Sequence, residues 1–378
     1  MSTTSSADII VIGAGMAGAS VAAELSGTAR VALIEAEDRP GVHSTGRSAA
    51  LFTTTYGPPP VRALSRASQA FLENGHGPGG APFLRRRGVM FLARSDQAAT
   101  AAALRSEMGA FLTPVTAEAA CARVPILRPG YLGEALADST AADIDVDALH
   151  QHYLRTLRAG GGSVTCAAPV RAATRAGDHW RVTTSAGDFA APFVINAAGA
   201  WADEVAVLAG IAPMGLQPKR RTALLVAPPD GVAVDDWPML VDVDEEFYVK
   251  PDAGMLLLSP ADATPCPPGD AQPDELDIAI AVDRVQRAFD LPVRRIAHRW
   301  AGLRSFVADG VPVAGFDPAA EGFFWLAGQG GYGIQTAPAL ARLAAALVRG
   351  EGVPQDIAAE GVSAADLAPG RPGLGGRV

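Results

Sequence analysis

The N-terminal part of the chain alternates between apolar runs and a stretch of small residues. Residues 9–12 (IIVI) are wholly apolar, which is typical of a strand buried on both faces of a sheet, and residues 30–35 (RVALIE) repeat the pattern. The stretch between them is rich in Ala and Ser and ends near Gly27, which predicts a helix packed closely on a sheet. Strand, helix and strand at this spacing form a βαβ unit, which requires parallel strands.

Two later segments predict further strand–helix units of the same sheet. Residues 193–205 run from an apolar strand into a helix, and residues 322–350 run from an aromatic strand through glycines into an alanine-rich helix. Stretches of period two lie between them, and in residues 245–259 a PDAG turn separates two such strands. We therefore expect an α/β fold, α+β overall, with a Rossmann-like dinucleotide-binding domain and a second, mainly antiparallel substrate domain.

The order of these segments predicts two domains that are both discontinuous in sequence. The chain has 378 residues, which is long for one core. The predicted dinucleotide-binding domain comprises residues 1–52, 142–214 and 298–378, and the predicted substrate domain comprises residues 53–141 and 215–297. The Gly- and Pro-rich tail after Glu351 is expected to be loosely held.

Composition and charge exclude several classes of protein. Hydrophobic residues make up 49% of the chain and charged residues 19%, as in globular proteins, and a net charge of −9 argues against nucleic-acid binding. Three scattered cysteines outside any CxxC spacing predict neither a disulfide framework nor a zinc site. The chain shows no signal peptide and no apolar stretch suited to a transmembrane segment. We expect a soluble cytoplasmic protein, with peripheral membrane association left open.

Two candidate metal motifs do not meet the requirements of a metal site. DIDVD at residues 143–147 begins like a calcium loop but lacks the glycine and the glutamate that such a loop requires. Asp147 is instead expected to be the N-cap of the helix that follows. His150 and His152 on that helix are two positions apart, so they face apart and cannot share a metal ion. No metal site is expected.

A dinucleotide motif lies between the first strand and the first helix. Gly13, Gly15 and Gly18 form G-x-G-x-x-G, and Glu35 ends the next strand. The first glycine allows a tight turn, the second admits a pyrophosphate, and the third lets helix and strand pack closely. The helix N-terminus supplies N–H donors and a partial positive charge, and Glu35 would accept both ribose hydroxyls.

Two further stretches favour FAD over a nicotinamide dinucleotide. Residues 43–50 (HSTGRSAA) offer amides and hydroxyls with little bulk, which could wrap phosphates and the edge of a planar ring, with Arg47 fixing the loop. Residues 328–336 (GQGGYGIQT) form a second glycine nest before a helix, whose N-terminus suits a ring position that gains negative charge on reduction. Because no cysteine falls in a tethering motif, we expect the FAD to be non-covalent.

The sequence resembles the D-amino-acid oxidase superfamily of FAD-dependent oxidoreductases, and within it the bacterial D-arginine dehydrogenases, from about Asp8 to beyond Ala346. The motifs that carry the resemblance are HSTGRSAA, ADIDVDALHQ, NAAGAW, MGLQPKRR, FYVKPDAGMLL, WAGLRSFVADG and EGFFWLAGQGGYGIQT. The resemblance implies oxidative deamination of D-amino acids to 2-oxo acids and ammonia, with hydride transfer from Cα to flavin N5.

The resemblance also implies the residues of two adjoining sites. For the cofactor these are, beside the three glycines of the motif, Ala14, Ala17, Glu35, Ala36, Ser44, Thr45, Gly46, Arg47, Ser48, Ala49, Ala50, Val170, Gly330, Gly331, Tyr332, Gly333, Ile334 and Gln335. For the substrate and its catalysis they are Tyr56, Arg221, Tyr248, Arg304 and the backbone of Gly331.

The surroundings of the two arginines agree with this assignment. Arg304 lies in the apolar stretch WAGLRSFV, where a buried guanidinium needs an anionic partner and its planar fork suits a carboxylate. The alternatives are a structural ion pair for Arg304 and a solvated basic run for Arg221 in PKRRT. Tyr56 and Tyr248 are either ordinary half-buried aromatics or hydroxyls that close over the substrate.

Two positions depart from the arginine-preferring relatives. Where those relatives carry a histidine and an acidic residue, this chain has Leu51 and Gly88. We therefore predict a substrate pocket with an apolar wall at Leu51 and free space at Gly88, which favours apolar D-amino acids over D-arginine. An acidic substrate held by Arg85, Arg86 or Arg87 is the open alternative.

Alternatives remain for both the electron acceptor and the reaction class. Residues 254–259 (GMLLLS) carry no lysine of the kind that the resemblance associates with use of oxygen, so we expect a quinone or carrier as acceptor, with O₂ as the alternative. A secondary-amine oxidase of the sarcosine or glycine type, or a 2-hydroxy-acid oxidase, would use the same pocket. A flavin-carrying subunit of a larger complex is an alternative of another class. The partners expected are a small-molecule amino acid and the acceptor, without nucleic acid.

Overall fold

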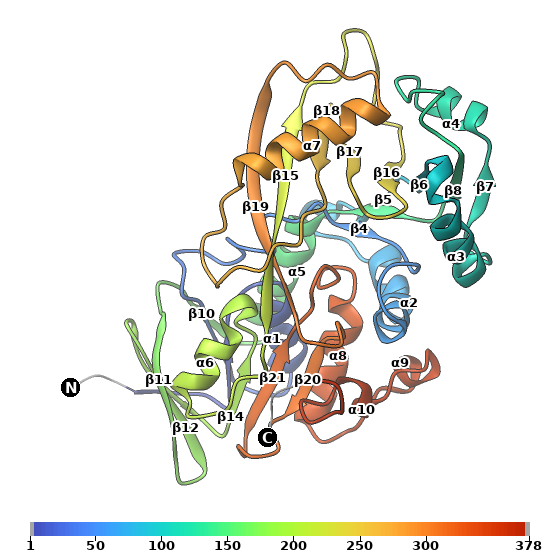
Figure 1. The fold of residues 1–378 in the computed structure, drawn as a ribbon. Helices are drawn as coiled ribbons and strands as arrows, with labels where there is room; N and C mark the ends of the chain where they lie inside the picture. The colour runs from blue at the N-terminus through green and yellow to red at the C-terminus, as the bar shows by residue number, and fades with distance from the viewer. Residues whose placement is uncertain (1–3, 375–378) are drawn as a thin grey trace.

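The computed structural model describes residues 4–374, which fold around two large β-sheets (Figure 1). The six-stranded sheet lies in the lower part of the figure. Its strands follow the order β10 (Ser163–Thr165), β3 (Val31–Ile34), β2 (Ile9–Ile12), β14 (Phe193–Asn196), β21 (Phe323–Ala327) and β20 (Val313–Phe316). The first five strands are parallel, and β20 pairs antiparallel with β21.

The two faces of this sheet are buried by different elements. Ile9 and Val11 join a core with three helices, α1 (Met16–Ser26), α5 (Val146–Ala159) and α8 (Ala337–Val348). Ile10 and Ile12 point to the opposite face, because side chains alternate along a strand, and they pack against α6 (Ala202–Leu208) and a small, mainly antiparallel sheet. Burial on both faces explains why the strands read as continuous apolar runs.

Two small sheets complete this part of the chain. The four-stranded sheet contains, in order, β1 (Thr4–Ser6), β13 (Gly187–Ala191), β12 (His179–Thr184) and β11 (Val170–Ala176). The three-stranded sheet contains β4 (Leu51–Phe52), β9 (Ala142–Ile144) and β5 (Leu84–Arg86).

The eight-stranded sheet forms the upper part of Figure 1. Its order is β19 (Ile296–Phe306), β15 (Gln217–Val226), β18 (Met255–Ser259), β17 (Tyr248–Asp252), β16 (Met239–Asp242), β6 (Val89–Ala93), β8 (Glu134–Asp138) and β7 (Thr113–Val115). Every neighbouring pair is antiparallel except β16 with β6. Helix α7 (Glu275–Ala288) covers it through Ile278 and Val285, which join the core of the sheet.

The remaining helices are short or peripheral, apart from α2. They are α2 (Pro59–Asn74), α3 (Ala98–Met108), α4 (Ala117–Arg123), α9 (Gln355–Ala359), α10 (Ala364–Leu367) and the 3₁₀ helices η1 (Pro78–Gly80), η2 (Ser95–Gln97) and η3 (Gly199–Trp201). Within residues 4–374, no helix has both the length and the apolar character needed to cross a bilayer.

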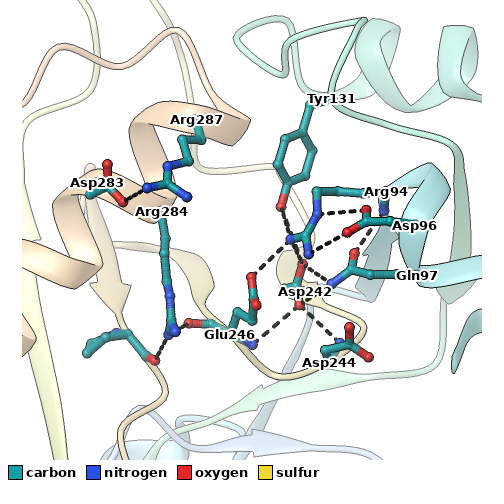
Figure 2. Close-up of polar contacts among 11 residues, drawn as sticks. Arg94, Asp96, Gln97, Tyr131, Asp242, Asp244, Glu246, Asp283, Arg284 and Arg287 are labelled. Atoms are coloured by element: carbon teal, nitrogen blue, oxygen red, sulfur yellow. Dashed lines mark hydrogen bonds and ion pairs between the residues drawn. The ribbon is translucent and has the colours of Figure 1, made fainter.

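A buried carboxylate organises the turn between β16 and β17, as Figure 2 shows. Asp242 is fully buried and accepts hydrogen bonds from the side chains of Gln97 and Tyr131 and from the backbone amides of Asp244 and Glu246. Burial raises the pKa of Tyr131 to about 12, so its hydroxyl stays protonated and donates. The turn that leads into β17 is therefore held in one conformation.

The predicted fold class is confirmed, with a parallel dinucleotide-type sheet and a mainly antiparallel second sheet. The PDAG turn is also present, and Ala253 and Gly254 take positive φ angles of 50° and 77° between β17 and β18. The residue limits of the two domains remain a prediction.

Two local expectations were wrong. The N-cap of α5 is Asp145, whose carboxylate accepts from the amide of Ala148, so Asp147 lies in the first turn and not at the cap. The tail after Glu351 is not loose: Glu360 pairs with Arg66 at 2.6 Å, and Leu367 is fully buried. The last four residues of that tail lie outside the described part of the chain.

Candidate functional site

A cavity of about 470 Å³ lies where the carboxyl ends of β2 and β3 meet the inner face of β15 and β19. Pockets of this size hold small ligands and cofactors, and the carboxyl edge of a parallel sheet is where α/β proteins bind them. The lining comes from segments far apart in sequence, including the loops after β2, β3 and β14 and the segment before α8.

The loop after β2 fits only small residues. Gly13 has a φ of +98°, and a Cβ at Gly18 would lie 1.8 Å from the carbonyl oxygen of Gly13. The turn therefore requires glycine at both positions. Gly15 begins α1 without a side-chain cap of its own, and the hydroxyl of Thr45 instead accepts a hydrogen bond from the amide of Met16 at 2.9 Å.

Glu35 lies beside this loop and lines the cavity. One carboxylate oxygen accepts from the amide of Ala14 at 2.8 Å, and the other accepts from the amide of Glu37 at 3.0 Å. Each carboxylate oxygen can accept a second hydrogen bond, so the oriented group can still bind ribose hydroxyls.

The loop of residues 43–50 is tied to the strand β19. The hydroxyl of Ser44 donates to the carbonyl oxygen of Leu303 at 2.7 Å, and the indole of Trp300 donates to the carbonyl oxygen of Arg47 at 3.0 Å. The guanidinium of Arg47 donates to the carbonyl oxygen of Ala301 and pairs with Asp270. Arg47 thus holds the loop against β19, and its role in a cofactor site stays a prediction.

The glycine nest before α8 presents free amides to the cavity. Gly330 has a φ of +54°, and a Cβ on it would lie 2.3 Å from the ring of Phe306, so only glycine fits. Gly331, Gly333 and Ile334 line the cavity, and their N–H groups have no partner among the residues that the structure describes. Such a group of amides suits an electron-rich ring edge.

Arg221 and Arg304 project from neighbouring strands toward the same space. In the antiparallel register Arg221 lies opposite Gly302, and Arg304 is two residues further along β19, so both side chains occupy one face. Both line the cavity, and in the described part of the chain neither forms an ion pair with a carboxylate. Burial and the charge of Arg304 lower the pKa of Arg221. The site is thus arranged for an anion.

The basic run PKRRT is divided between different environments. Lys219 lies 5.2 Å from the ring centre of Phe306, and Arg220 pairs with Asp277 at 2.7 Å on the other face of β15. Only Arg221 of the three lines the cavity, where its Nε donates to the carbonyl oxygen of Asp262. The run is therefore not a solvated patch.

Three aromatic residues surround the arginines. Tyr248 lines the cavity, with its ring centre 6.0 Å from the guanidinium carbon of Arg221. The hydroxyl of Tyr56 accepts from Arg304 at 3.4 Å, and its ring lies edge-on to that of Tyr332 with centres 5.0 Å apart. Burial raises the pKa of Tyr332 to about 12, which keeps its hydroxyl protonated.

The structure brings most of the residues predicted from the sequence to the cavity wall. Those that line it are Gly13, Gly15, Ala17, Glu35, Ala36, Ser44, Thr45, Arg47, Ser48, Ala49, Val170, Arg221, Tyr248, Arg304, Gly330, Gly331, Gly333 and Ile334. Those that do not line it are Ala14, Gly18, Gly46, Ala50, Leu51, Tyr56, Gly88, Tyr332 and Gln335. Gln335, in the second group, accepts a hydrogen bond from the amide of Thr53 and donates one to Ser65, so it joins segments that lie outside the cavity lining.

Leu51 and Gly88 lie away from the cavity lining. Leu51 is half-buried in β4, opposite Asp143 of β9. Gly88 precedes β6, and a Cβ on it would meet the carbonyl oxygen of Asp138 at 3.4 Å. The strand residues Arg85 and Arg86 are exposed, and Arg87, whose side chain is 6% exposed, pairs with Asp143. A substrate pocket formed by these residues stays a prediction.

Sequence reasoning missed two contacts near the cavity. His43 and Trp201 both line it with ring centres 4.6 Å apart, and His43 bonds to Glu37 at 2.7 Å. Lys250 is buried two residues beyond Tyr248 on β17, where its ammonium group lies 3.1 Å from Asp143. Trp201 in NAAGAW and Lys250 in FYVKP were visible in the motifs, but their partners are remote in sequence.

Comparison with known proteins identifies a family whose profile matches most of the chain. Residues 8–347 match the sequence profile of the family described as FAD dependent oxidoreductase. A curated relative from Xenopus laevis, FAD-dependent oxidoreductase domain-containing protein 1, is 29% identical over 41% of this chain. The chain spans about a third of the length of the curated relatives that it matches.

Two solved structures share the fold. Glycine oxidase from Geobacillus kaustophilus superposes with a TM-score of 0.79 at 21% identity, covering 94% of this chain and 98% of that one. L-alpha-glycerophosphate oxidase from Mycoplasma pneumoniae, solved with FAD bound, gives a TM-score of 0.82 at 17% identity, covering 92% and 95%. The free amides, the oriented glutamate and the crowded glycines described above fit such a cofactor.

Proposed function

The chain belongs to the family of FAD-dependent oxidoreductases, and from this we propose that it oxidises D-amino acids to 2-oxo acids and ammonia. The observation that carries the proposal is the pair formed by Arg221 and Arg304. Two guanidinium groups without ion-paired carboxylates among the described residues face the same cavity that the dinucleotide motif lines. A substrate carboxylate would neutralise this charge.

The roles of the residues follow from their positions. Arg221 and Arg304 would hold the carboxylate, with Tyr248 along one side and Tyr56 behind Arg304. The diphosphate would lie at the N-terminus of α1, the ribose at Glu35, and the ring against the amides of the glycine nest. These assignments rest on the cavity lining and on the motifs.

The chain needs to supply orientation more than acid–base chemistry. FAD, when bound, would accept the hydride that leaves the substrate Cα. Fixing the carboxylate at two points limits the rotation of the substrate and directs one face of its Cα, which is how positioning lowers a barrier. The imino acid would leave the cavity and hydrolyse in water to the 2-oxo acid and ammonia. The resemblance of the motifs to D-amino-acid oxidases supports the D configuration.

A preference for apolar side chains over arginine is part of the proposal. The acids among the described residues that line the cavity are Glu35, Glu37 and Glu204, which belong to the loop after β3 and to α6 and not to the strands that carry the arginines. A guanidinium side chain would therefore find no acid in the cavity lining at the substrate end, and Glu245, whose charge raises the pKa of Arg304, is the nearby carboxylate outside that lining. For such a substrate, the missing charge-assisted hydrogen bond would weaken binding by about 1.5–3 kcal/mol.

The acceptor is proposed to be a quinone or carrier, with O₂ as the alternative. The structure weakens the sequence argument for this preference, because a lysine does occur near the site. Lys250 donates to the carbonyl oxygen of Ala49 at 3.4 Å, and Ala49 lines the cavity. The acceptor should therefore be assigned by reoxidation with each compound separately.

Anaerobic bleaching of the flavin spectrum by a panel of substrates tests the proposal. We expect apolar D-amino acids to bleach the flavin rapidly, D-arginine slowly, and L-amino acids not at all. The release of ammonia should match the amount of flavin reduced. Bleaching only by sarcosine, glycine or 2-hydroxy acids would replace the proposal by the corresponding oxidase. No bleaching by any compound would favour a flavin-carrying subunit of a larger complex.

A further inference from the structure

We propose that His150 is a positioning residue of the dinucleotide site: its imidazole holds the carbonyl of Ala14 so that the amide of Gly15 faces the cavity. The inference rests on the proposed function only in taking FAD to occupy that cavity. It concerns neither the substrate nor the acceptor.

His150 reaches the glycine loop from a different helix. It lies on α5 with an exposed fraction of 4%, and its Nε2 is 2.9 Å from the carbonyl oxygen of Ala14. A carbonyl can only accept, so Nε2 carries the proton. Because the amide of Ala14 donates to Glu35 at 2.8 Å, this residue is held at both its N–H and its carbonyl.

The geometry of the peptide bond means that this contact also fixes the direction of the Gly15 N–H. In a planar trans peptide, the carbonyl of one residue and the N–H of the next point in opposite directions. With the Ala14 carbonyl directed toward α5, the Gly15 N–H points away from α5. Gly15 lines the cavity, and its N–H has no hydrogen-bond partner within the described residues 4–374. It is therefore a free donor at the N-terminus of α1, where a phosphate oxygen binds best.

The imidazole is itself fixed by the cofactor loop. Gly41 packs on the ring so closely that a Cβ there would lie 3.0 Å from Cε1 and 3.2 Å from Nδ1, and Gly41 has a φ of +78°. The carbonyl oxygen of Gly41 accepts from the amide of Gly46 at 2.8 Å. One side chain thus contacts both the glycine loop and Gly41, and both segments line the cavity in which the diphosphate would bind.

The ionisation state of the ring agrees with this role. Burial lowers the pKa of His150, so the ring is neutral near pH 7. A neutral imidazole has one N–H, and the Ala14 carbonyl uses it. The alternative is that His150 only fills space between α5 and the loops, and the two roles predict different ligand dependences.

Three substitutions separate the hydrogen bond from the volume of the ring. His150→Phe keeps a ring and removes the donor, and His150→Gln keeps an N–H donor. His150→Met, a flexible apolar side chain, serves as the second variant without a donor if the Phe variant does not fold. His152→Phe is the matched control, because His152 lies on the same helix among the rings of Phe71, Phe83 and Tyr153.

Binding to the full chain is measured in two ways that do not require turnover. Flavin fluorescence on dilution gives the Kd for FAD, and competition against FAD gives the affinities for ADP and for adenosine. We expect His150→Phe and His150→Met to weaken FAD about tenfold to a hundredfold, the range for a hydrogen bond to a charged group. ADP should weaken by a similar factor and adenosine should not, because only ADP carries the diphosphate. His150→Gln and His152→Phe should stay within about threefold of the wild type.

Two results would overturn the inference. One is an unchanged Kd for FAD in both variants without a donor. The other is an equal loss for ADP and adenosine, which would show that His150 acts through volume alone. Neither result depends on amino-acid oxidation, so a failure of the proposed activity in the bleaching experiment would be recognised separately.

Discussion

The hydroxyl of Ser44 donates a 2.7 Å hydrogen bond to the carbonyl oxygen of Leu303, the residue before Arg304. The loop predicted to wrap the cofactor is therefore joined directly to the strand that carries a predicted substrate arginine. Trp300 and Arg47 reinforce the same contact. A change in the cofactor loop should thus alter substrate binding as well as FAD binding, and so should a change in the substrate strand.

Ser44→Ala tests this coupling. Losing this half-buried hydrogen bond costs about 1 kcal/mol, so we expect the Kd for FAD and the KM for the amino acid each to rise about fivefold. The matched control is Ser185→Ala, because Ser185 is exposed like Ser44 and also donates to a backbone carbonyl at 2.7 Å, but its partner Ala167 does not belong to β19. If Ser44→Ala changes the Kd for FAD and leaves KM untouched, the loop and the strand act independently.

Adjacent arginines on β15 provide a sharper comparison. Arg221→Met removes a guanidinium from the cavity, whereas Arg220→Met breaks an ion pair with Asp277 on the opposite face. We expect Arg221→Met to lower kcat/KM about a hundredfold, which corresponds to a charge-assisted hydrogen bond of about 3 kcal/mol. Arg220→Met should keep kcat/KM and show a lower melting temperature. Equal kinetic effects of the two variants would argue against a carboxylate site at Arg221.

Tyr56→Phe probes the contact behind Arg304. The hydroxyl of Tyr56 accepts from this guanidinium at 3.4 Å, a long hydrogen bond, and so its loss should cost less than about 1 kcal/mol. We expect KM to rise about threefold with kcat nearly unchanged. Steady-state kinetics with one D-amino acid is sufficient. A large fall in kcat at constant KM would instead place the hydroxyl at the reacting atoms.

Leu51→Ala is the direct test of the pocket wall predicted from the sequence. Because Leu51 is half-buried in β4 and does not line the cavity, we now expect the ratio of activities on D-leucine and D-phenylalanine to stay within about twofold of the wild type. The ratio is measured from kcat/KM for each substrate. A clear shift toward the larger side chain would place Leu51 at the pocket after all.

The sequence predicted those features that depend on local patterns. The buried strands, the glycine turn and the PDAG hairpin each follow from neighbouring residues, and the structure contains all of them. The arginine pair was foreseen only as two separate residues, since their alignment depends on the register of β15 against β19. The contact of His150 with Ala14 spans 136 positions, and no periodicity in the sequence signals it.

One error shows how close alternatives compete at a helix start. Asp145 and Asp147 both precede the apolar positions of α5, and either could cap it. The structure selects Asp145, whose carboxylate lies 2.8 Å from the amide of Ala148, because strand β9 ends at Ile144 and the helix follows without a linker. The pattern of residues located the helix but not its first turn.

The pH dependence of stability provides the last prediction. Burial lowers the pKa of His150 in the folded chain below the ordinary value of about 6.5, and the hydrogen bond to Ala14 and the charge of Asp147 offset only part of this shift. The unfolded chain therefore binds a proton that the folded chain does not. The neutral ring contributes its full stability above about pH 6.5, and the contribution falls as the pH drops toward the lowered pKa.

His150→Gln removes this titration while keeping a donor for Ala14. We expect the melting temperature of the wild type to fall more between pH 7.5 and pH 5.5 than the melting temperature of the variant. His152, whose pKa burial also lowers, is present in both proteins, and its effect cancels in the comparison. A wild type whose melting temperature falls less than that of the variant would mean that the folded chain binds the proton more readily than the unfolded chain, against the expected direction.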